Sequence, residues 1–237
     1  MFSFIHLAAV ALAAASIAPA QGQTPAANPF ADLDKYIYPL APEIPCPPVT
    51  TDTTDAPEVQ PWADKAKALV TEWFPKVCQL LATEGWKPPK EVHLVFKRDI
   101  GPPAYTVGHT ITIKVPWITA HPDDFGMVIH ELTHVIQNYP NGADRPGWLV
   151  EGMADYVRWW RYEPEGPHPK ITERNKYTDS YRVTAEFLAW CQHHENYHLV
   201  TELDRAMRHG EDPMPVFQKV TGKDVDALWS EFEAAQK

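Results

Sequence analysis

The segment VIHELTHVI at residues 128–136 combines an apolar helical pattern with two histidines and a glutamate. His130 and His134 are four residues apart, so on an α-helix both imidazoles lie on one face and can reach the same metal ion. Glu131 would project near the open coordination position, where it can take a proton from a metal-bound water. The spacing H-E-x-x-H therefore predicts a helix that carries a zinc site and a general base.

The flanking residues favour a buried helix at this position. Residues 121–124, HPDD, supply a proline suited to a first turn and acids that complement the positive end of a helix. Apolar residues recur from Val128 to Ile136, and the pattern ends near Pro140. We expect this helix to be packed into the body of the protein.

A second helix is predicted for residues 148–156, WLVEGMADY, where Glu151 and Asp155 share one face. His130, His134 and Glu151 would form a His2Glu ligand set that leaves one position for water. Asp155 would accept the second N–H of a ligating imidazole and fix its tautomer. The spacing leaves the reverse assignment open, with Asp155 as third ligand and Glu151 outside the metal shell. The turn-rich loop at 141–147 is short enough to bring the two helices together.

Four segments resemble the basic secretory proteins of plants and microbes, a family of zinc metallopeptidases. They are HELTHVIQN at 130–138, PGWLVEGMADYVR at 146–158, DSYRVTAEFLAW at 179–190 and VTGKDVDALW at 220–229. The resemblance runs from about Pro61 to Phe232, and it implies a zincin-like fold and a secreted peptidase. It also implies zinc held by His130, His134 and Glu151.

The charge of the chain departs from that family's basic members. It has 31 acidic residues against 21 lysines and arginines, for a formal charge of -10. This balance argues against a role based on attraction to polyanions, so we expect no nucleic-acid partner. It leaves the predicted metal site unaffected.

In the predicted reaction, Glu131 removes a proton from a zinc-activated water and later delivers it to the leaving amine. Tyr181 is the candidate for stabilising the oxyanion, because it falls in the family-like segment at 179–190 and related zincins often use a tyrosine or histidine beyond the third ligand. Two alternatives remain open at this stage. They are Tyr177 and the group formed by His193, His194 and His198.

The predicted fold class is α+β, a zincin-like metallopeptidase with a small N-terminal sheet, an active-site helix and a mostly helical C-terminal half. Apolar periodicity predicts a helix at 62–82, kinked or split at Pro75. Alternation predicts strands at 91–97 and 110–115. For the segment between them, 101–108, the resemblance implies an edge strand above the metal, and the alternative is a surface loop with one buried tyrosine. Further helices are expected at 178–193, 200–209 and 224–235.

Residues 1–20 predict a secretory signal peptide, because the apolar stretch from Phe2 to Ile17 precedes a small-x-small site ending at Ala20. The alternative is a membrane anchor that stays in place, although the apolar run is short for a span. Residues 21–60 are expected to form a proline-rich extended arm, and residues 61–237 the metallopeptidase domain. We expect a secreted or periplasmic protein with no stable membrane association after cleavage.

Cysteine usage adds little to this interpretation. Cys46, Cys78 and Cys191 are an odd number, so at most one internal disulfide can form, and the sequence does not assign the pair. No C-x-x-C spacing links them, so we do not expect them to bind metal.

The sequence therefore predicts a secreted peptidase that uses Zn2+ to hydrolyse peptide or protein substrates, and it assigns no oligomeric state. The alternative is a non-catalytic zinc-containing binding or defence module of the cell envelope. A purely structural zinc site would be closed by a fourth protein ligand, and the sequence offers no candidate near the motif. Glu131 also has no use in a structural site, which favours catalysis.

Overall fold

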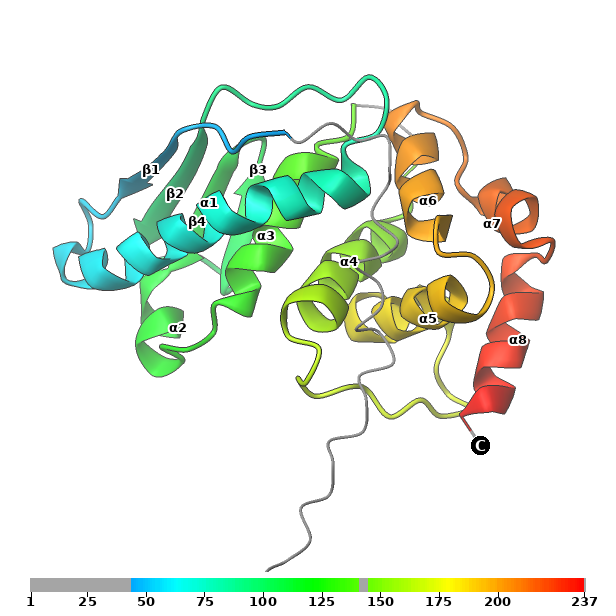
Figure 1. Ribbon diagram of the computed structural model, residues 1–237. Helices are drawn as coiled ribbons and strands as arrows, with labels where there is room; N and C mark the ends of the chain where they lie inside the picture. The colour runs from blue at the N-terminus through cyan, green and yellow to red at the C-terminus, as the bar shows by residue number, and fades with distance from the viewer. Residues whose placement is uncertain (1–43, 141–144, 237) are drawn as a thin grey trace, which may run out of the picture.

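The computed structural model describes residues 44–140 and 145–236 (Figure 1). The predicted signal peptide and most of the predicted arm lie outside these ranges. A four-stranded sheet and its helices form one half of the molecule, and the C-terminal helices form the other (Figure 1). The strands are β1 (Val49–Asp52), β2 (Val92–Lys97), β3 (Ala104–Val107) and β4 (Thr110–Lys114), in the spatial order β1-β2-β4-β3.

Helices account for most of the remaining described chain, as expected for the predicted α+β organisation. They are α1 (Gln60–Leu81), α2 (Val115–Ala120), α3 (Gly126–Gln137), α4 (Gly147–Tyr156), α5 (Tyr181–His194), α6 (Leu199–Arg208), α7 (Met214–Thr221) and α8 (Val225–Ala235). Short 3-10 turns lie at η2 (Pro57–Val59) and η4 (Tyr177–Asp179), and a π-helical turn, η3 (Val157–Tyr162), continues α4. The sequence analysis did not foresee β1, α2 or α7.

The sheet is parallel except at β3, which pairs antiparallel with β4 and forms an edge. In β2 the alternation expected from the sequence is observed, with Val92, Leu94 and Phe96 fully buried. The segment at 101–108 therefore contains an edge strand, as one of the two interpretations predicted. Tyr105 is 39% exposed, so the alternative of a loop with a buried tyrosine is wrong. An edge strand leaves backbone N–H and C=O groups available to another chain.

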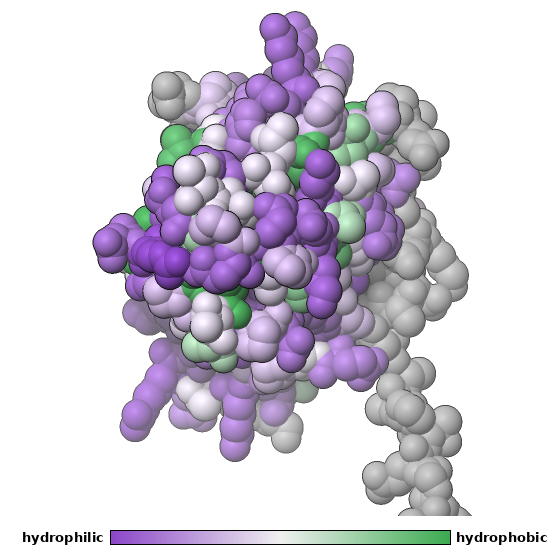
Figure 2. Space-filling view, turned by 90° about the vertical axis from the view of Figure 1, so that its left-hand side faces the viewer, coloured by the Kyte–Doolittle hydropathy of each residue, from purple (hydrophilic) through white to green (hydrophobic). Residues whose placement is uncertain are grey.

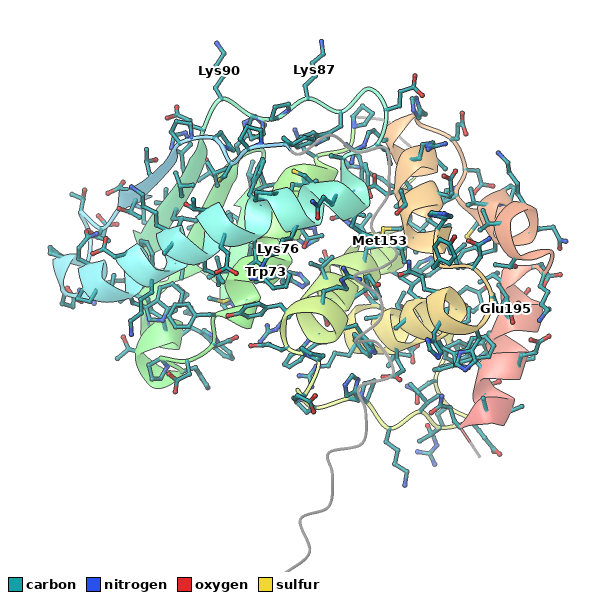
Figure 3. The ribbon with its side chains drawn as sticks, viewed as in Figure 1. Trp73, Lys76, Lys87, Lys90, Met153 and Glu195 are labelled. Carbon is teal, nitrogen blue, oxygen red and sulfur yellow. The ribbon has the colours of Figure 1, made fainter. Side chains whose placement is uncertain are left out.

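Helix α1 lies across the sheet and packs on β1, α3 and α6 (Figure 1). It continues through Pro75 as one helix of 22 residues, so of the predicted kink or split the split is not observed. Its buried side includes Val70, Phe74 and Leu81, spaced as one face of a 3.6-residue period requires. On its outer side Lys76 lies over the ring of Trp73, 4.5 Å from the centroid (Figure 3).

Helices α4 and α5 pack closely at Gly152. A Cβ atom at this position would lie 2.2 Å from Cγ2 of Thr184 on α5, so no side chain fits there. The glycine allows the two backbones to approach, which brings the start of α5 near the acidic residues of α4. The packing of these two helices thus positions Tyr181, the first residue of α5, relative to Glu151.

One buried arginine ties the ends of α1 and α3 to α6. The Arg208 guanidinium donates to the carbonyl oxygens of Leu81 (2.9 Å) and Gln137 (3.2 Å), at the C-terminal ends of the two helices. Its charge is matched by the fully buried Asp204 at 2.9 Å, which also accepts from the Tyr139 hydroxyl at 2.7 Å. A cation at two helix C-termini satisfies carbonyls that the helices themselves leave open.

The face shown in Figure 2 is mostly hydrophilic, with scattered apolar residues. Lys87 and Lys90 extend away from the body on the loop between α1 and β2 (Figure 3). Within the described ranges, no helix combines the length and the apolar character needed to cross a bilayer. Cys46, Cys78 and Cys191 all carry free thiols, and burial raises the pKa of Cys46 to about 11.

Replacing Arg208 by methionine should lower the free energy of unfolding by about 3–5 kcal/mol, because Asp204 would be left as an uncompensated buried charge. Urea unfolding followed by circular dichroism measures this loss. Arg98→Met is the matched control. Arg98 pairs with Glu58 at the surface with 52% of its side chain exposed, so its removal should cost less than about 1 kcal/mol. Equal losses in the two variants would contradict the assigned role.

Candidate metal and active site

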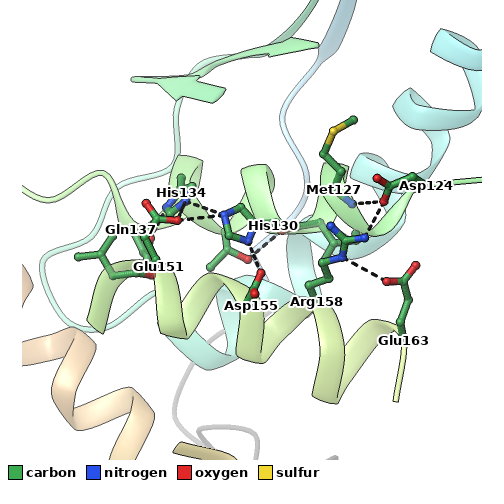
Figure 4. Close-up of polar contacts among 12 residues, drawn as sticks. Asp124, Met127, His130, His134, Gln137, Glu151, Asp155, Arg158 and Glu163 are labelled. Atoms are coloured by element: carbon green, nitrogen blue, oxygen red, sulfur yellow. Dashed lines mark hydrogen bonds and ion pairs between the residues drawn. The ribbon is translucent and has the colours of Figure 1, made fainter. Parts of the chain in front are cut away.

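Helices α3 and α4 pack against each other and bring the predicted site residues together (Figure 4). His130, Glu131 and His134 project from α3, while Glu151 and Asp155 project from α4. The helix α3 begins at Gly126, slightly later than the HPDD signal suggested, although Asp124 accepts from the first-turn backbone N–H of Met127 at 3.3 Å. Residues 141–144 of the intervening loop lie outside the described ranges.

Three side chains point their ligand atoms at a common centre. The Nε2 atoms of His130 and His134 are 3.2 Å apart, and Oε2 of Glu151 lies 3.2 Å from the first and 3.4 Å from the second. Ligand atoms about 2.0–2.1 Å from a tetrahedral ion are about 3.3–3.4 Å apart. The triangle formed by His130, His134 and Glu151 is therefore the size of one face of such a shell, and these residues could hold a metal ion.

The hydrogen bonds around the two histidines settle which nitrogens face this centre. His130 Nδ1 donates to Asp155 Oδ1 at 2.7 Å, and a carboxylate can only accept. His134 Nδ1 donates to Gln137 Oε1 at 2.7 Å, because the Gln137 amide nitrogen is turned to the carbonyl oxygen of Val150. Both neutral imidazoles then direct the lone pair of Nε2 inward, toward an anionic carboxylate. Three acceptor atoms at hydrogen-bond distance require a cation or a proton between them.

The pKa shifts follow from the same geometry. Burial lowers the pKa of His130, but hydrogen bonds to Asp155 and Glu151 outweigh this effect and raise it to about 9. Burial raises the pKa of Glu151, whereas its contacts with the two histidines bring it well below its usual value. Both shifts favour a proton shared between His130 and Glu151. Metal binding must displace it, so the affinity for a metal ion falls as the pH is lowered.

Asp155 does not face the centre. It is 6% exposed, and its Oδ1 holds the nitrogen of His130 that points away from Glu151. Glu151 occupies the position that the sequence analysis gave to the third ligand. The reverse assignment of these two carboxylates, which the spacing had left open, does not fit this arrangement.

Glu131 is 6% exposed and lies outside the triangle. Its Oε2 accepts a hydrogen bond of 2.7 Å from the Thr106 hydroxyl, on the edge strand β3. Thr106 was not predicted as a site residue, because strand alternation can place it on the helix side of the sheet but cannot align it with a residue 25 positions away. Gln137 was not predicted either, although the i, i+3 spacing from His134 was a usable signal.

These residues line a cleft of about 880 Å3. The edge strand β3 and the residues before it form one wall, and the starts of α4 and α5 contribute to the other. Tyr181 lies in this wall with its ring 6.1 Å from that of His130 and nearly parallel to it, at 16°. The negative charge of Glu151 is the main cause that raises the pKa of the Tyr181 hydroxyl, and partial burial raises it further. The hydroxyl therefore stays protonated and can donate a hydrogen bond.

The alternatives to Tyr181 do not line the cleft. Tyr177 packs among aromatic rings, 5.3 Å from Trp148 and 6.1 Å from Trp229 between centroids. The residues His193 and His194 end α5, and His198 precedes α6, away from the residues that surround the cleft. Among these candidates, the structure brings Tyr181 alone to the metal-site residues.

A family model described as peptidase of plants and bacteria matches residues 56–232. The chain belongs to this family. The match begins just before η2, ends within α8 and includes all the cleft residues described above, and it confirms the resemblance inferred from the four sequence segments. Comparison with curated proteins and with solved structures finds no match. The cleft, with its possible metal site and the buried Glu131 beside it, thus belongs to a member of a peptidase family.

Replacing the two acidic residues of α4 one at a time should separate their roles. Glu151→Ala should abolish stoichiometric binding of Zn2+, used here as the probe ion, because it removes one corner of the triangle. Asp155→Asn should keep binding but weaken it by about 10–100-fold, because the group that orients His130 is altered. Isothermal titration with Zn2+ on the metal-stripped variants measures both. The opposite order of effects would reverse the assignment.

Proposed function

We propose that this chain is a secreted zinc-dependent peptidase with a zincin-like fold. The observation that carries the proposal is the convergence of two imidazole lone pairs and a carboxylate beside the buried Glu131, in a member of a peptidase family. Two nitrogen ligands and one oxygen ligand suit Zn2+, and a three-residue set leaves a position for the reacting water. A structural site would require a fourth protein ligand, and the described residues offer none at the centre.

When bound, the zinc ion would polarise the scissile carbonyl and lower the pKa of the attacking water. Glu131 acts as the general base, because it adjoins the ligand triangle without belonging to it. It takes the proton of the water and passes it to the leaving amine. Thr106 holds the carboxylate of Glu131 through its hydroxyl at 2.7 Å, which limits the rotation of this base.

The substrate is a peptide segment that adds to the edge strand β3. This strand lines the cleft, and its outer side is not covered by another strand of the described sheet. Val107 is 69% exposed, which is a high value for an apolar residue on a strand. Main-chain hydrogen bonds to such an edge bind an extended peptide independently of most of its side chains. The carbonyl to be cleaved would then face the metal-site residues.

Tyr181 would donate its hydroxyl proton to the oxyanion that develops during hydrolysis. Its place beside His130 and its protonated state support this role. The remaining parts of the proposal rest on sequence alone. Export depends on residues 1–20, which lie outside the described ranges, and the formal charge of -10 argues against nucleic acid as a partner.

The alternative function is a zinc-containing binding or defence module of the cell envelope without catalysis. Both functions predict stoichiometric zinc, so metal content alone does not separate them. The separating measurement is cleavage of an unfolded protein or a peptide library, with and without chelator. Zinc bound at one equivalent together with no cleavage by the wild-type protein would favour the binding module.

Glu131→Gln should keep near-normal zinc content and lose peptidase activity by several orders of magnitude, because the amide cannot accept the proton of water while the ligand triangle is unchanged. Metal analysis and hydrolysis of a casein-type substrate measure the two properties on the same preparation. Glu165→Gln, on an exposed loop residue away from the cleft, is the matched control and should change neither. Unchanged hydrolysis by Glu131→Gln would remove this residue from the mechanism.

Tyr181→Phe should lower kcat by about a hundredfold to a thousandfold with little change in KM, since it removes a donor that acts on the developing oxyanion. Steady-state kinetics on a peptide substrate measure both constants. Tyr197→Phe changes an exposed tyrosine outside the cleft and should leave them unaltered. A rise in KM alone would mean that Tyr181 binds substrate and does not stabilise the transition state.

A further inference from the structure

One end of the cleft carries basic side chains that the proposed reaction does not use. Trp117 Nε1 donates to Asp124 Oδ2 at 2.8 Å. Arg158 donates to Asp124 Oδ1 at 2.6 Å (Figure 4). The guanidinium groups of Arg158 and Arg182 lie over the ring of Trp159, 4.3 Å and 4.5 Å from its centroid. All five residues line the cleft. Together they form the region that we term the Trp159 arm.

The two arginines of the Trp159 arm differ in charge balance. Arg158 is matched by Asp124 at 2.6 Å and by Glu163 at 3.2 Å, and its side chain is 17% exposed (Figure 4). Arg182 is exposed and forms no ion pair with any residue in the described ranges. Its one hydrogen bond runs from Nη1 to the carbonyl oxygen of Pro167 at 3.4 Å. Arg182 therefore adds an unmatched positive charge to the cleft of an acidic protein.

The backbone holds Arg182 in place at some cost. Ser180 and Tyr181, the two residues before it, both have positive φ values, 69° and 47°. Non-glycine residues are strained in this region and persist there only where the surroundings enforce the conformation. The corner is supported by Thr184, whose hydroxyl donates to the carbonyl oxygen of Tyr177 at 2.6 Å. The strained corner directs two successive side chains, Tyr181 and Arg182, into the cleft wall.

The direction of a bound peptide decides which of its residues meet the Trp159 arm. Strand β3 begins near this arm, because Ala104 pairs with Ile113 at the end of β4, and Trp117 follows in α2. A peptide that adds antiparallel, the slightly more stable pairing, runs from Val107 toward Ala104. The residues after its scissile bond then enter the Trp159 arm.

We propose that Arg182 forms a subsite for a carboxylate on the substrate, on the C-terminal side of the bond that is cleaved. This inference rests on the proposed peptidase function and adds a substrate class to it. A guanidinium presents paired N–H donors that match the two oxygens of a carboxylate, and stacking on Trp159 fixes its plane before the ligand arrives. The carboxylate comes from an Asp or Glu side chain or from the C-terminus of a short peptide.

The first experiment identifies cleavage sites in a peptide library by mass spectrometry, for the wild-type holoenzyme, Arg182→Ala and Arg182→Glu. We expect the wild-type enzyme to cleave preferentially where Asp or Glu follows within three residues, or near a free C-terminus. Arg182→Ala should lose this preference by roughly tenfold in relative kcat/KM, the effect of a charge-assisted hydrogen bond. Arg182→Glu should shift it toward Lys and Arg. In a library with amidated C-termini only Asp and Glu side chains offer a carboxylate, so a preference that persists there comes from side chains and one that disappears comes from the C-terminus.

Arg174→Ala is the matched control, because Arg174 is an exposed arginine that lies outside this cleft. It should keep the wild-type preference. A wild-type enzyme that cleaves without acidic or terminal preference would overturn the proposal, and so would an Arg182→Ala variant that keeps the preference. Either result would leave the proposed peptidase function intact.

A second measurement separates failure of the subsite from failure of the peptidase function. Fluorescence anisotropy compares the binding of labelled peptides that differ only in Glu or Gln, with the zinc-loaded Glu131→Gln protein so that no cleavage occurs. The Glu peptide should bind roughly tenfold more tightly, and the added Arg182→Ala change should remove the difference. If the wild-type protein cleaves nothing, the difference in affinity between the two peptides still tests whether Arg182 binds a carboxylate. Equal binding of the two peptides would overturn the subsite.

Discussion

The hydrogen bond between His130 and Asp155 is the interaction on which the site depends. It crosses from α3 to α4, it is buried at both ends, and its acceptor can only accept. The direction of this one bond turns the free nitrogen of His130 toward Glu151 and His134. Without it, the imidazole could rotate or change tautomer, and the three ligand atoms would no longer converge.

The chemistry of the site was predictable from the sequence because it depends on local spacing. The positions of His130 and His134, and of Glu151 and Asp155, are four-residue repeats on helices, and a helix fixes their directions. The strands β2 and β4 were predictable for the same reason, since alternation is a local property. The sequence therefore predicted the candidate ligands, and the structure brings Glu151, not Asp155, to the two histidines.

Contacts across the fold could not be inferred in this way. Thr106 contacts Glu131 because the edge strand β3 packs on α3. The hydrophobic pattern of the sequence does not predict how a strand packs on a distant helix. Pro75 suggested a break in α1, yet burial of Phe74 and its neighbours holds the helix together, an example of packing that overrides local propensity. The strand β1 was not predicted, because it has only four residues, lies in a proline-rich segment and is too short to show a clear alternation of apolar and polar residues.

The position of Arg208 has a consequence for how the protein unfolds. A single guanidinium closes the last turns of both α1 and α3, yet it belongs to α6, far along the chain. The sheet half of the molecule therefore depends on a residue of the C-terminal half. Proteolysis that detached α6 would free the ends of both helices in one event, so loss of the cleft and global unfolding should be a single cooperative transition.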